Sequence, residues 1–128
     1  MNRKTKIFVT IISLVVILFG IIQVQINAAD NIVPTISFYN AAGEIVKGSN
    51  VGIYVKDDSG IVSIKYCWDY ATTQANPQIV QKDGTATAIR VDVPLPEGNG
   101  LHVLWVKAMD QFENESEWIK RPFYVVDA

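Results

Sequence analysis

From Asp30 onward the chain consists of short runs in which apolar and polar residues alternate, separated by clusters of Gly, Asn, Asp and Pro. Val51, Ile53 and Val55 alternate in this way with Gly52, Tyr54 and Lys56. Because successive side chains of a strand point to opposite faces, such alternation predicts strands with one buried face. No segment after Asp30 keeps the 3.6-residue period of a helix, so we expect an all-β fold.

Seven segments have this character and begin roughly 9 to 17 residues apart, which is compatible with a two-sheet sandwich. The alternation places Val62, Ile64 and Trp68 on the inward face of the third segment, with the Trp68 indole expected at the centre of the core. The predicted strands are residues 35–39, 51–56, 62–69, 78–81, 87–93, 101–109 and 118–127.

Two parts of this region resemble the bacterial Ig-like domains of secreted and surface proteins. The resemblance covers most of residues 32–127 and implies an immunoglobulin-like or fibronectin-III-like sandwich that serves as a spacer, stalk or adhesive module. Where such domains carry a glycine in the last loop, this chain has Glu113. The residues that carry the resemblance are Asp58-Ser59-Gly60-Ile61, Ser63-Ile64-Lys65-Tyr66, Trp68, Gly100, His102, Leu104, Val106-Lys107-Ala108, Asp110, Asn114 and Ser116.

The first 29 residues have a different character. Arg3, Lys4 and Lys6 precede an uncharged, predominantly apolar run from Ile7 to Ile22, and Ala28 and Ala29 follow it. This order is typical of an export signal. We expect residues 1–29 to form a hydrophobic helix that is either a cleaved signal peptide or a retained membrane anchor. Both alternatives place residues 30–128, the single Ig-like domain, in a secreted or cell-surface location, with the membrane contacted only through the leader.

The charge of the exported portion excludes one class of partner. Residues 30–128 contain all 13 acidic residues and 8 of the 11 basic ones, which gives a formal net charge of −5 with His102 neutral. Since phosphate backbones are bound mainly by clustered Lys and Arg, we expect no nucleic-acid binding.

Catalysis is also not expected. His102 is the only histidine, and no nucleophile with a partnered base accompanies it in the sequence. We expect His102 to hydrogen-bond a loop.

Cys67, the only cysteine, alternates with the inward residues, so an exposed thiol that pairs between molecules is one interpretation. A small, partly buried apolar residue is the other.

Acidic side chains occupy two loops that this topology brings to one end of the sandwich. They are Asp57, Asp58, Asp110, Glu113 and Glu115. Several converging carboxylates could bind Ca²⁺, the only cofactor that we consider, whereas ordinary turn formation explains each residue singly.

Aromatic residues outside the predicted core indicate a binding surface. Trp105 and Tyr54 lie on outward faces of their strands, and Phe112 and Trp118 flank the last loop. Exposed aromatic rings stack on sugars or form the centre of protein contacts. We therefore expect a non-catalytic module that binds a protein or glycan at the cell surface. The alternative is a structural stalk or assembly component that pairs with other copies through its sheet edges and exposed aromatics.

Overall fold

The computed structural model describes residues 31–70 and 76–128. The chain divides into two compact units, Met1–Asn31 and Ile32–Ala128, and the second is the β-rich domain. The leader of residues 1–29 lies outside the described residues, as do residues 71–75 of the loop that follows the third predicted strand. Within the described ranges, no helix has the length and apolar character needed to cross a membrane.

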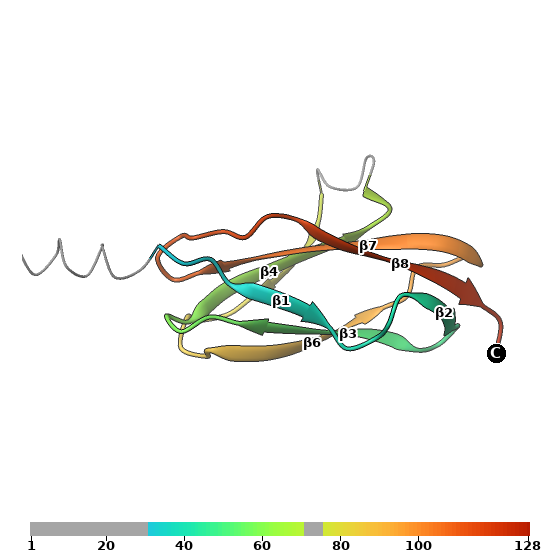
Figure 1. Cartoon of the computed structure of the whole chain (residues 1–128), viewed down its shortest axis with the longest axis horizontal. Helices are drawn as coiled ribbons and strands as arrows, with labels where there is room; N and C mark the ends of the chain where they lie inside the picture. The colour runs from blue at the N-terminus through green and yellow to red at the C-terminus, as the bar shows by residue number, and fades with distance from the viewer. Residues whose placement is uncertain (1–30, 71–75) are drawn as a thin grey trace, which may run out of the picture. The chain divides into compact units, whose positions relative to one another are not determined.

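The domain is all-β, as predicted, and its strands form two sheets stacked as a sandwich (Figure 1). One sheet has three strands in the order β1-β3-β6, and the other has five in the order β2-β8-β7-β4-β5. The strands are β1 (Thr35–Phe38), β2 (Gly43–Val46), β3 (Asn50–Lys56), β4 (Ile61–Trp68), β5 (Gln78–Gln81), β6 (Ala88–Pro94), β7 (Gly100–Asp110) and β8 (Ile119–Val126).

The structure thus has eight strands where the sequence predicted seven. The missed strand is β2, which pairs in parallel with β8, whereas all other neighbours are antiparallel. It has four residues, and of these only Ile45 is buried. One inward side chain gives no recognisable period, and the strand forms because β8 offers it an edge to pair with.

The core is made by the alternate side chains that the sequence pattern assigned to it. Val51, Ile53 and Val55 of β3 are fully buried, and Leu104 and Val106 of β7 face them from the other sheet. Burying each such side chain stabilises the fold by about 1.5 to 3 kcal/mol relative to leaving it exposed. The domain therefore has a hydrophobic core of its own.

The position predicted for Trp68 is wrong in one respect. Trp68 is half-buried and packs against the core from its rim, while Phe123 is the largest fully buried side chain. The Trp68 ring meets Phe123 edge-on with centroids 6.1 Å apart, and its indole N–H donates to the carbonyl of Pro94 at 3.0 Å. An indole N–H needs such a polar partner, and Trp68 finds one because it is the last residue of β4.

A register shift between Ile61 and Ser63 changes the start of the inward face of β4. Ile61 is fully buried, and Val62, which the alternation placed inward, is only half-buried. Such a bulge inserts one extra residue, so the alternation resumes in the opposite phase after it. Ile64 and the following residues keep the predicted orientation.

Candidate functional site

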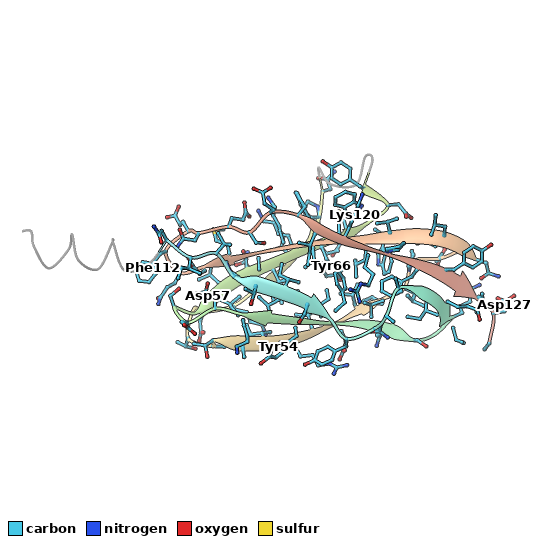
Figure 2. The ribbon with its side chains drawn as sticks, viewed as in Figure 1. Tyr54, Asp57, Tyr66, Phe112, Lys120 and Asp127 are labelled. Carbon is cyan, nitrogen blue, oxygen red and sulfur yellow. The ribbon has the colours of Figure 1, made fainter. Side chains whose placement is uncertain are left out.

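The two acidic loops meet at one end of the sandwich, as predicted. The hydroxyl of Ser59, between β3 and β4, donates to Asp57 and lies 3.1 Å from Oδ2 of Asp110 at the end of β7. The backbone N–H of Gln111 donates to the carbonyl of Gly60 at 3.0 Å. Figure 2 shows Asp57 and Phe112 at this end and Asp127 at the other.

Glycine is required at position 60, where the β3–β4 loop passes close to the backbone of Gly84. The φ of Gly60 is 103°, and a Cβ added there would collide with the backbone carbonyl oxygen of Gly84. Only glycine has both the conformation and the space.

Asp110 is fully buried and acts as the acceptor that orders the β7–β8 loop. Its carboxylate accepts from the backbone N–H groups of Phe112 and Asn114, both at 2.9 Å, and from the Asn114 side-chain amide at 3.0 Å. Burial raises the pKa of Asp110, but the hydrogen bonds from Asn114, Phe112 and Ser59 outweigh it, so the pKa lies below its ordinary value.

The other predicted ligands do not join Asp57 and Asp110. Glu115 accepts from Lys107 at 3.1 Å and from Lys65 at 3.3 Å. Burial raises the pKa of Glu115, but the two lysines lower it by more. Asp58 and Glu113 are exposed. Among the described residues, no group of three or more His, Cys, Asp or Glu side chains lies where it could hold a metal ion.

Calcium binding by these loops therefore stays a prediction. Asp57 and Asp110 both accept hydrogen bonds from backbone N–H groups of their loops, which is a structural role. A rise in melting temperature at millimolar calcium is the measurement that would reveal a site.

The four aromatic residues proposed to bind a partner do not form one surface. Tyr54 lies on the outward side of the three-stranded sheet and meets Tyr39 edge-on with centroids 5.9 Å apart. Phe112 is exposed in the β7–β8 loop. Trp105 lies on β7 of the five-stranded sheet, and Trp118 directly precedes β8. Figure 2 shows Tyr54 and Lys120 on opposite sides of the sandwich.

The outward side of the five-stranded sheet, here called the outer face, carries several exposed large hydrophobic residues. The side chain of Leu101 is 64% exposed and that of Tyr124, directly opposite on β8, is 54% exposed. Nine large hydrophobic residues are exposed in the part of the chain that the structure describes, and five of them lie on this face: Val46, Tyr70, Ile79, Leu101 and Tyr124.

The sequence interpretation placed Trp105 outward but did not identify Tyr124 or Val46. Tyr124 lies between the buried residues Phe123 and Val125, so alternation within β8 carried the signal. Val46 belongs to the strand that was missed, and no sequence signal placed it beside β8.

Trp105 is half-buried at the centre of the outer face. Its ring lies against Tyr70, with centroids 4.2 Å apart, and the ammonium group of Lys120 lies 5.0 Å from its centroid. Lys107 contacts the ring of Trp118 in the same way at 4.9 Å. Both tryptophans are therefore packed against neighbours and are partly buried.

His102 hydrogen-bonds a loop, as predicted. Nδ1 lies 2.6 Å from Oδ2 of Asp69, and Nε2 lies 3.1 Å from the carbonyl oxygen of Gly98. The ring also meets Trp68 edge-on at 6.4 Å. The imidazole thus joins the end of β4 to the turn before β7, a role that a tyrosine fills in related sandwiches.

Cys67 lies on the outward side of β4 and is nevertheless buried, with 5% of its surface exposed. It lies opposite Trp105 on β7 and lines a pocket with Tyr66, Trp68, Asn76 and Gln78. The small buried residue is the interpretation that its location supports, and intermolecular pairing stays a prediction.

Comparison with solved structures identifies the fold as immunoglobulin-like. A mutant of the SrpA adhesin from Streptococcus sanguinis matches with a TM-score of 0.50 and 21% sequence identity over 77% of this chain, and this chain spans 60% of the adhesin chain.

Two further structures match less well. A fibronectin(III)-like module of CbhA from Clostridium thermocellum has a TM-score of 0.45 and 11% identity, covering 73% of this chain and 99% of the module. The PKD domain of a peptidase from a Thermoplasmatales archaeon has a TM-score of 0.46 and 14% identity, covering 73% and 92%. No family model matches the sequence, and neither does any curated protein.

Proposed function

We propose that this chain is a non-catalytic binding module that acts outside the cytoplasm and contacts a protein or glycan partner through its outer face. The observation that carries this proposal is the gathering of exposed apolar side chains on that face. Large exposed apolar patches of soluble domains commonly mark interaction sites.

The position of these side chains strengthens the argument. Leu101 and Tyr124 stand directly opposite each other in the β7–β8 pair, so their apolar surfaces are contiguous. Tyr70 and Trp105 extend the patch toward β4. Aromatic rings that are already packed lose little conformational freedom when a partner covers them.

Two observations support a location at the cell surface. The leader of residues 1–29 has the pattern of an export signal. The immunoglobulin-like fold also occurs in a protein described as an adhesin.

A second candidate function is an assembly component that pairs with other copies of itself. It is favoured by two opposite charges, Glu44 and Lys120, that lie beside the same apolar patch.

The proposal is tested with purified residues 32–128 on arrays of defined glycans and of purified surface proteins. Binding by the wild type should be lost in the Tyr124→Ser and Leu101→Ser variants. Tyr39→Ser is the matched control, because Tyr39 is also 54% exposed but belongs to the β1–β3 side of the sandwich. Binding that survives both outer-face substitutions would refute the proposal, as would the absence of any partner, including a second copy.

A further inference from the structure

We propose that the outer face docks against the same face of a second copy of this chain, related by a two-fold axis that crosses the strands near Val103 and Pro122. The inference rests on the proposed function, since it names a partner for the same surface. It is argued from the register of three adjacent strands and from the positions of two charges.

Three consecutive rows of the outer face lie over β8 and β7, and the first of them extends to β2. Each row consists of residues that the strand register places opposite one another. The first row is Glu44, Tyr124 and Leu101, the second is Pro122 and Val103, and the third is Lys120 and Trp105.

The first of these rows contains an anion, Glu44, and the third contains a cation, Lys120. Successive rows are two residues apart along β8, which corresponds to about 7 Å. The apolar second row therefore lies midway between Glu44 and Lys120. A second copy turned over about an axis along that row brings its third row over the first row of its partner.

This arrangement makes the patch self-complementary. The ammonium group of Lys120 in one copy faces the carboxylate of Glu44 in the other, and the symmetry forms this contact twice. Leu101 of one copy meets Trp105 of the other, while Pro122 and Val103 pack against their own counterparts. Because sheets stack about 10 Å apart, side chains as long as Lys and Glu can meet between them.

Among the residues that the structure describes, neither charge is neutralised by an opposite charge, although the ammonium group of Lys120 lies 5.0 Å from the centroid of the Trp105 ring. Within the described residues, neither Lys120 nor Glu44 takes part in an ion pair, whereas Lys65 and Lys107 share Glu115. A partner that covered the patch without a carboxylate near Lys120 would bury an uncompensated charge, which is costly. A second copy supplies one at the required place.

The experiment uses residues 32–128, because this unit contains the whole hydrophobic core and lacks the apolar leader, which could associate by itself. Sedimentation equilibrium between 5 and 500 micromolar, roughly the range expected for a small interface, should show a reversible dimer. Lys120→Glu or Glu44→Lys alone should weaken dimerisation at least about tenfold, because like charges then face each other.

The decisive variant combines both substitutions in one chain. Lys120→Glu with Glu44→Lys restores opposite charges across the two-fold, so dimerisation should return to within about threefold of the wild type. Lys56→Glu, an exposed charge reversal on β3 of the other sheet, is the control and should leave dimerisation unchanged. Circular dichroism checks that each variant keeps its strands.

Four outcomes would overturn the inference: a monomer up to 500 micromolar, a dimer unaffected by the single reversals, a double variant as weak as either single one, or a Lys56→Glu variant weakened as much as Lys120→Glu. A monomer that still binds a glycan or another protein through Tyr124 and Leu101 would leave the proposed function standing. A dimer that responds as predicted, with no other partner found, would establish self-association as the role of the face.

Discussion

The hydroxyl of Ser59 lies 3.1 Å from Oδ2 of Asp110, across 51 residues of sequence, and joins the two loops at one end of the sandwich. Ser59 belongs to the loop between β3 and β4, and Asp110 ends β7. The contact ties the three-stranded sheet to the five-stranded one, because β3 belongs to the first and β7 to the second.

Replacing Asp110 by Asn should lower the free energy of unfolding by about 2 to 3 kcal/mol, because an amide presents N–H donors where the buried carboxylate accepts several. Ser59→Ala removes a single donor and should cost about 1 kcal/mol. Urea denaturation measures both. Equal losses in the two variants would show that the carboxylate has no special part in the loop.

The free energy of unfolding should also depend on pH through the carboxyl group of Asp110. The pKa of this carboxyl is depressed in the folded protein, so the stability that it contributes is present above its unfolded pKa and is lost as pH falls through the folded value. The free energy of unfolding of the wild type should therefore decrease more steeply below about pH 4 than that of Asp110→Asn. Parallel curves from pH 2 to 6 would contradict this expectation.

Replacing Glu113 by Gly should stabilise the domain by about 1 kcal/mol. Glu113 has a φ of 65°, a left-handed conformation that costs a residue with a Cβ about 1 to 2 kcal/mol. Glycine adopts this conformation freely. Glu113→Ala, which removes the charge but keeps the Cβ, should give no such gain in melting temperature.

Replacing His102 by Phe should lower the free energy of unfolding by about 2 kcal/mol, because the ring loses its hydrogen bonds to Asp69 and to the Gly98 carbonyl. Trp68 contacts this ring, so its fluorescence should change in the folded state as well. Leu101→Ala, an exposed position on the same strand, serves as the comparison and should cost far less.

Cys67 should react slowly with a thiol reagent in the folded protein and rapidly in urea, because only 5% of its surface is exposed. Labelling is followed by absorbance, with the reaction in 8 M urea as the reference. Equal rates in the two conditions would show that the outward side of β4 opens readily, and intermolecular pairing would then become feasible.

The alternation of side chains in β3 predicted which residues are buried, and the structure confirms it for Val51, Ile53 and Val55. Alternation is a local property, because the pleat of a strand sends neighbouring side chains to opposite faces wherever the strand lies. The loops that carry Asp57 and Asp110 were likewise expected at one end, since the order of strands in a sandwich fixes which loops meet.

The sequence by itself determined the class of fold, the inward faces and the turns, because each depends on the conformational preferences of a few consecutive residues. Only the tertiary structure decided that Val46 lies beside β8, that Trp68 sits at the rim while Phe123 fills the interior, and that Glu44 and Lys120 flank one apolar patch. These features depend on which strands become neighbours and in what register. Strand neighbours and register are determined by packing between residues far apart in the chain, and a local sequence period carries no information about such contacts.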